Sequence, residues 1–130
     1  MTSTDETKAV LDLLEAQVAM NAYQFFADVI EPPDGYKPHD GIGICFKVRG
    51  GTDGDPSVLM HPSFQFKIYG ADEVACRAAA RTLHDNFNEK ADGNILAVYR
   101  ETMPVTLKEP EEPNWTYALV FYKVMVRNLN

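Results

Sequence analysis

The clearest alternation of apolar and polar positions predicts a strand from about Val58 to Tyr69. Pro62 interrupts this run, and a proline inside a strand indicates an edge position or a bulge. Gly70 ends the strand. In the segment that follows, small or apolar residues recur four positions apart, which predicts a helix whose narrow face packs closely against a sheet. This ladder consists of Ala75, Ala79, Leu83 and Phe87.

Two elements are predicted before this unit. The capping box Ser3-x-x-Glu6 begins a helix expected from about Thr4 to Met20. Its apolar face is expected to comprise Val10, Leu11, Leu14 and Val18. Alternation over residues 42–49 then predicts a half-buried strand. The segment from Ala22 to Ile30 is apolar without a clear period, so it either extends the helix or forms a short strand.

Two further strands are predicted after the central helix. One runs from about Ile95 and ends either at Glu101 or, past Pro104, at Lys108. The last runs from Trp115 to Arg127, and both of its faces are apolar, so both are expected to meet protein. We expect its smaller, even-numbered face to cover the alanine ladder. The face that carries the large aromatic residues is then left over; it includes Trp115, Tyr117 and Phe121.

The order of elements, α-β-β-α-β-β, predicts an α+β fold. We expect a four-stranded, mostly antiparallel sheet with the N-terminal helix and one central helix packed on one face. A chain of 130 residues is expected to form a single domain, 1–130. Runs of proline, glycine and acidic residues predict mobile loops near 31–41, 50–57 and 109–114.

Composition narrows the possible partners. The formal net charge of −7 argues against tight binding to a phosphate backbone, which needs clustered basic residues. No apolar run approaches the ~20 residues that span a bilayer, and the polar, acidic start is unlike a signal peptide. Cys45 and Cys76 lie on a predicted strand and a predicted helix without a CxxC pair, which favours a reducing compartment.

Candidate chemistry is sparse. Cys76 and His84 share the predicted helix but lie eight residues apart, about 12 Å along its axis, too far to touch. Cys45 could meet His39 or His61 only through tertiary structure, and a structural thiol is the favoured interpretation. The Asp53-Gly54-Asp55 segment lacks the remaining ligands of a calcium loop. We therefore expect no catalytic residue, metal or cofactor, and no enzyme activity.

The stretch from His61 to Gly70, the alanine-lined helix, Met103-Pro104 and the long strand from Trp115 to Arg127 carry a family resemblance. The short N-terminal helix through Leu11 and Leu14 fits it too. In order and length of elements the chain resembles the tail-terminator (tail-to-head joining) and minor-capsid or neck proteins of long-tailed bacteriophages. The Pro32–Pro38 loop has no counterpart that we can point to.

The resemblance implies a homo-hexameric ring that caps the tail tube and joins it to the head connector. It implies that the protein is located in the tail or neck of the virion, and in the host cytoplasm during assembly. It also implies that DNA passes through the ring without specific binding, and that the protein contacts no membrane. A ring needs a heterologous interface. The residues expected to form interfaces lie on the last strand and on the loops: Arg49, Asp53, Asp55, Glu109, Glu111, Glu112, Trp115, Tyr117, Phe121, Lys123 and Arg127.

Three alternatives stay open from the residues themselves. The chain could be a dimeric α+β module that binds a small molecule or a peptide. Glu109, Glu111 and Glu112 could be catalytic carboxylates, although a proline-flanked acidic run is more typical of a solvated turn. The aromatic face of the last strand could equally be ordinary core.

Overall fold

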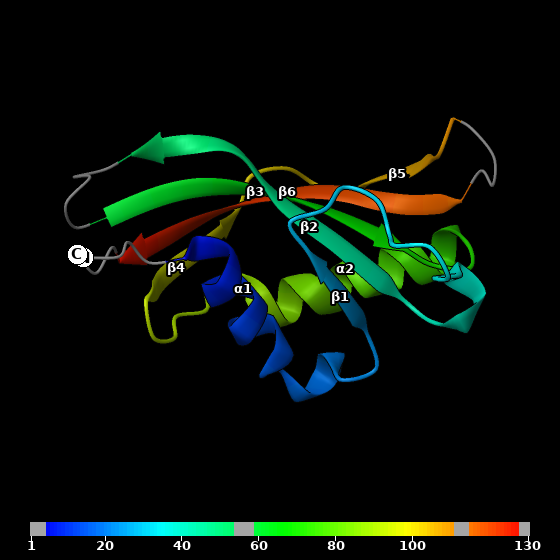
Figure 1. The fold of residues 1–130 in the computed structure, drawn as a ribbon, viewed down its shortest axis with the longest axis horizontal. Coiled ribbons are helices and arrows are strands. Elements are labelled where there is room, and N and C mark those ends of the chain that lie inside the picture. The colour runs from blue at the N-terminus through cyan, green and yellow to red at the C-terminus, as the bar shows by residue number, and fades with distance from the viewer. Residues whose placement is uncertain (1–4, 54–58, 111–114, 128–130) are drawn as a thin grey trace.

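The computed structural model describes residues 5–53, 59–110 and 115–127. Within these ranges, one mixed sheet is covered on one side by two α-helices (Figure 1). The helices are α1 (Glu6–Glu15) and α2 (Glu73–Phe87). The strands are β1 (Gln24–Ala27), β2 (Gly43–Asp53), β3 (Leu59–Tyr69), β4 (Ile95–Arg100), β5 (Val105–Lys108) and β6 (Thr116–Arg127). The order across the sheet is β1-β2-β3-β6-β4, and β5 also pairs with β6.

The predicted α+β class and the placement of both helices on one face are confirmed. The prediction of four strands is wrong, because the sheet has six. All neighbouring strands are antiparallel except β1 and β2, which are parallel. The apolar segment from Ala22 to Ile30 supplies the additional edge strand β1. Its four residues are too few to show a period, which is why alternation did not reveal it.

The second additional strand arises from a break between β4 and β5. Glu101 N–H still donates to Phe121 O at 2.8 Å, but Phe121 N–H donates to the side-chain oxygen of Thr102 at 3.2 Å. Pro104 has no N–H to offer the ladder. The chain therefore leaves β6 at this point and returns as β5, so that β4 and β5 lie along opposite halves of the same long strand.

The N-terminal helix is shorter than predicted. Asp5, not Ser3, is its N-cap, and the Asp5 carboxylate accepts from Lys8 N–H at 3.0 Å; Ser3 lies outside the described residues. The helix ends at Glu15, and a separate 3₁₀ turn follows at Val18–Met20. Val18 was expected on the apolar face but is 81% exposed, whereas Leu13 is buried there.

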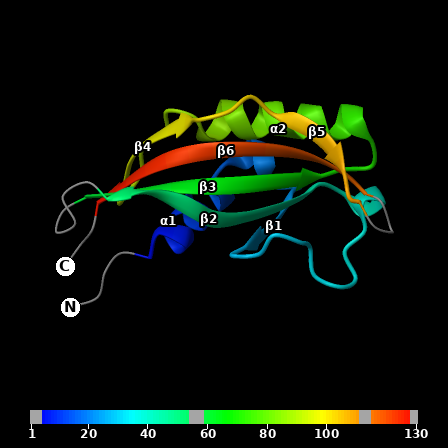
Figure 2. The ribbon, with the colours of Figure 1, turned by 90° about the horizontal axis from the view of Figure 1, so that it is seen from above.

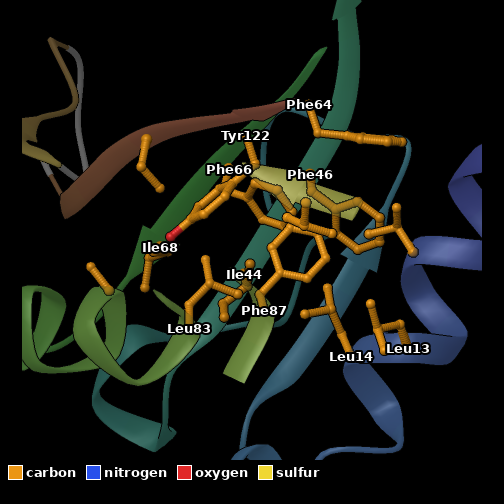
Figure 3. Packing of buried hydrophobic residues seen from close by; sticks show 14 of the residues in the cluster. Leu13, Leu14, Ile44, Phe46, Phe64, Phe66, Ile68, Leu83, Phe87 and Tyr122 are labelled. Carbon is orange, nitrogen blue, oxygen red and sulfur yellow. The ribbon is translucent and has the colours of Figure 1, made fainter. Parts of the chain in front are cut away.

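The core lies between the sheet and the two helices. Phe66 is at its centre, with ring centroids 5.4 Å from Phe46, 5.4 Å from Phe87 and 5.6 Å from Tyr122 (Figure 3). From Ala118 to Val126 the even positions of β6 are buried and the odd positions are only partly buried. The expectation that the small face of the last strand covers the alanine helix is thus confirmed.

Pro62 lies in a central strand, so its predicted edge position is wrong. The predicted bulge is confirmed, because the β2–β3 register shifts between Val48 and Gly51, and Gly51 pairs with Pro62. β2 continues to Asp53, so the loop predicted near 50–57 begins later. Its residues 54–57 lie outside the described part of the chain.

Candidate functional site

The side of the sheet that the helices do not cover is the candidate functional surface. Figure 2 looks onto this side, with α2 behind β5. It carries the odd-numbered side chains of β6, which are partly buried, and the residues that pair with them from β3, β4 and β5. Its two ends differ in character.

An aromatic cluster occupies the end where β3 finishes and β6 begins. We define it as Tyr36, Tyr69, Trp115 and Tyr117. The Tyr36 and Trp115 rings meet edge to face at 5.9 Å, and Tyr69 lies 6.2 Å from Trp115 and 5.4 Å from Tyr117. Each pair is in the range that favours aromatic contacts. Trp115 and Tyr117 are therefore partly buried against the chain itself.

The loop between β1 and β2 brings Tyr36 onto the sheet. The Tyr36 hydroxyl donates to Gly41 O at 2.7 Å, and its ring lies directly on Gly43. A Cβ atom at Gly43 would come within 2.6 Å of the ring, so only glycine permits this approach. Burial raises the pKa of Tyr36 to about 12, which keeps the hydroxyl protonated as a donor.

A short polar network joins this cluster to the end of β5. Lys67 Nζ lies 3.2 Å from the Glu109 carboxylate, and both side chains are largely shielded, with 12% and 19% exposed. The Tyr69 hydroxyl donates to the same carboxylate, and Lys67 Nζ also lies 4.4 Å from the centre of the Tyr117 ring. Burial, and then the bond to Glu109, raises the pKa of Tyr69. The network fixes the point where β5 leaves the sheet.

A cavity of about 700 Å³ lies beside the aromatic cluster, and it is open to solvent. The loop segment 31–37 forms one wall, and Glu109, Pro110 and Trp115 form the other. Its lining combines aromatic and proline surfaces with three carboxylates and one lysine: Glu31, Asp34, Glu109 and Lys37. The arrangement suits a partner with an apolar body and a positive charge.

The other end of the uncovered face carries polar side chains beside Phe121. Phe121 pairs with Gln65, and Lys123 pairs with Ser63 on one side and Tyr99 on the other. The Ser63 hydroxyl donates to the Glu101 carboxylate. In the described ranges the Phe121 ring contacts no other ring, and its cross-strand partner on β3 is the polar Gln65.

The structure separates the residues expected at an interface into groups. Glu109, Trp115 and Tyr117 come together at the aromatic end. Phe121, Lys123 and Arg127 follow along β6, with Arg127 exposed at its end, and Arg49 is exposed on β2. Asp55, Glu111, Glu112 and the side chain of Asp53 lie outside the described part, so those predictions are untested.

Three residues of this surface were not found from the sequence: Tyr36, Lys67 and Tyr69. Tyr36 lies in a proline-rich loop with no counterpart in the family resemblance, and only the tertiary fold places it on Gly43. Lys67 is on the polar side of an alternating strand, and this pattern predicts a solvent-exposed side chain. The one available signal was an isolated tyrosine in a long loop, between the Pro32-Pro33 pair and Pro38.

The cysteine thiols and the His84 imidazole, which could support chemistry, are buried or bonded within the fold. Burial raises the pKa of Cys45 to about 12 and that of Cys76 to about 11, so both thiols stay protonated. Cys76 Sγ donates to Thr116 O at 3.4 Å, and His84 Nδ1 lies 3.0 Å from the Tyr122 hydroxyl. Burial lowers the pKa of His84. Among the described residues, no three metal-binding side chains converge.

Within the described ranges, neither α-helix has the length and apolar character needed to cross a bilayer. No family model matches the chain. No curated protein matches it either.

Solved structures do match. Eleven chains match this one, and one of them comes from the "Virion of native gene transfer agent (GTA) particle". The alignment covers 91% of this chain and 91% of the virion chain, with a TM-score of 0.57 and 13% sequence identity. At this identity the likeness shows a common fold over nearly the whole length of both chains.

Proposed function

We propose that this chain is a structural protein of a virion, and specifically a tail terminator. In this role it forms a ring that caps the finished tail tube and joins it to the head connector. The observation that carries the proposal is the fold shared, over 91% of both chains, with a chain of a virion particle. The sequence resemblance to tail-terminator proteins supports the finer assignment. The proposed role includes no reaction and no cofactor.

The uncovered sheet face is the proposed contact surface. Trp, Tyr and Arg are enriched at interface centres. The uncovered face carries Trp115 and Tyr117 at one end of β6 and Arg127 at the other. The chain's formal charge of −7 is compatible with a ring that lets DNA pass without retaining it.

Negative-stain microscopy of purified tail tubes tests this role. We expect the added protein to appear at one end of each tube. Lys123→Glu should reduce end occupancy by about tenfold or more, because it reverses a charge on the contact face. Arg81→Glu makes the same reversal on the exposed side of α2 and should leave occupancy unchanged. Absence of the wild-type protein from tube ends at saturating concentration would rule out the proposal.

The cavity favours one alternative, a dimeric module that binds a small molecule or a peptide. Its volume of about 700 Å³ is within the ordinary range of ligand pockets. Light scattering distinguishes the two. A dimer whose mass does not change with concentration, and which forms no larger ring, would favour the binding module.

A further inference from the structure

The two open edges of the sheet are β1 on one side and β4 with β5 on the other. Exposed large hydrophobic side chains gather along both. Val29 and Ile30 follow β1, and the other edge carries Tyr99, Met103, Val105 and Leu107. In the described residues, only Val18 and Val74 are comparable side chains located elsewhere. Exposed apolar edge strands are sites where another strand can pair.

In the described part of the chain, each edge strand has backbone groups that point away from its neighbour in the sheet. Glu109 N–H donates to Trp115 O, so the alternation of an antiparallel ladder leaves Thr106 and Lys108 facing away from β6. At β1, Gln24 and Asp28 donate their N–H groups to β2. The residues between them, Phe25 and Ala27, therefore alternate toward the open side. β1 and β5 are both four residues long.

The directions of the two edge strands are compatible with pairing between copies. β1 is parallel to β2, and three antiparallel steps lead from β2 to β5, so β5 runs opposite to β1. If neighbouring copies are related by a rotation that makes their sheets continuous, β5 of one copy lies antiparallel to β1 of the next. This arrangement brings Val29 and Ile30, just after β1, beside Met103 and Val105, at the beginning of β5.

The charges of the two edges are complementary. Asp28 and Glu31 are exposed next to β1, whereas Lys108 is exposed at the other edge and Arg100 is partly exposed there. Acidic residues also lie near β5, but they are engaged within the chain. Asp72 accepts from Ala75 N–H, and Glu73 lies 3.7 Å from Arg77. Glu101 accepts from Ser63, and Glu109 is paired with Lys67.

We propose that copies of this chain associate head to tail, with β5 of one copy pairing antiparallel with β1 of the next, so that the sheet continues from copy to copy. The inference deepens the proposed function and rests on it for closure into a ring, because a heterologous contact closes only at a suitable rotation. The occupant of each edge is a second copy of the same chain.

Sedimentation velocity of two edge variants and their mixture tests the pairing. Val105→Glu opposes Asp28 and Glu31 of the neighbour, and Ile30→Lys opposes Arg100. The substituted side chains are 53% and 43% exposed, so folding should be retained. Each variant alone should associate about tenfold or more weakly than wild type. An equimolar mixture should form heterodimers, because each variant keeps the edge that the other lacks.

Charge-matched controls use the same positions. Val105→Lys and Ile30→Glu bring opposite charges together and should weaken association less. In a second arm, Thr106→Pro removes an outward N–H that Thr106→Ala retains, so only the proline variant should lose association. Melting curves establish that each variant is folded.

Three outcomes would overturn the pairing: wild-type protein that is monomeric at its highest soluble concentration, a mixture no more associated than its components, or controls as damaging as the like-charge variants. Tube capping is scored separately with wild-type protein. Capping without edge pairing would leave the proposed function standing, and edge pairing without capping would refute the function alone.

Discussion

At the scale of single residues, Tyr36 and Gly43 determine the shape of the uncovered face. The ring of Tyr36 lies where a side chain at residue 43 would otherwise extend. That contact holds the loop between β1 and β2 over the sheet, and the loop forms one wall of the cavity. The position of Tyr36 in the loop therefore depends on glycine at residue 43 in the strand. Neither residue was predicted from the sequence to have this role.

Gly43→Ala should displace the Tyr36 ring, because its Cβ would lie 2.6 Å from Cζ of that ring. We expect a loss of about 1–3 kcal/mol in the free energy of unfolding, typical of overpacking. Emission from Trp115, the sole tryptophan, should shift as its contact with Tyr36 is lost.

A double-mutant cycle controls this prediction. In a Tyr36→Ala background the penalty of Gly43→Ala should largely disappear, because the clashing ring is gone. Equal penalties in both backgrounds would show that the close approach is not the cause.

Sequence reasoning succeeded where a residue's environment follows from local alternation. The partition of β6 into buried even positions and partly exposed odd positions was predictable, because side chains of a strand alternate between its two faces. The burial of Trp115 and Tyr117 by Tyr36 and Tyr69 was not, because those contacts join segments distant in the chain. The same holds for Lys67 and Glu109.

At the scale of elements, α2 holds the sheet in place through its buried face. It begins at a well-formed cap, where the Asp72 carboxylate accepts from Ala75 N–H at 2.8 Å. Three members of the predicted ladder are buried: Ala79, Leu83 and Phe87. Ala75 is only partly buried, and Cys76 and Ala80 are buried in addition. The helix was predictable because its period persists over several turns, whereas the four-residue strands β1 and β5 offered no such signal.

Asp72→Ala should lower the free energy of unfolding by about 1 kcal/mol, because it leaves a helix N–H without its cap. Asp72→Ser keeps a side-chain oxygen at the cap and should recover most of this loss. Urea denaturation measures both. An unchanged midpoint for Asp72→Ala would mean that the cap contributes nothing, despite its 2.8 Å hydrogen bond.

At the scale of the whole molecule, one side of the sheet is committed to the core and the other is available for contacts. Both open edges carry exposed apolar side chains as well. A single copy therefore presents a face and two unlike edges, which suits a subunit that contacts neighbours and an axial partner at once. The sequence could suggest this role only through family resemblance. A catalytic site can be recognised from a few residue types at a fixed spacing, whereas an assembly surface has no such pattern.

The central proposal is that the protein is part of a tail, and quantitative mass spectrometry of intact virions that encode this chain tests it most directly. We expect the chain in purified particles at the copy number of one hexameric ring per tail, and we expect it to stay with the tail fraction when heads and tails are separated. Its absence from purified virions, or recovery in proportion to the capsid shell, would contradict the proposal.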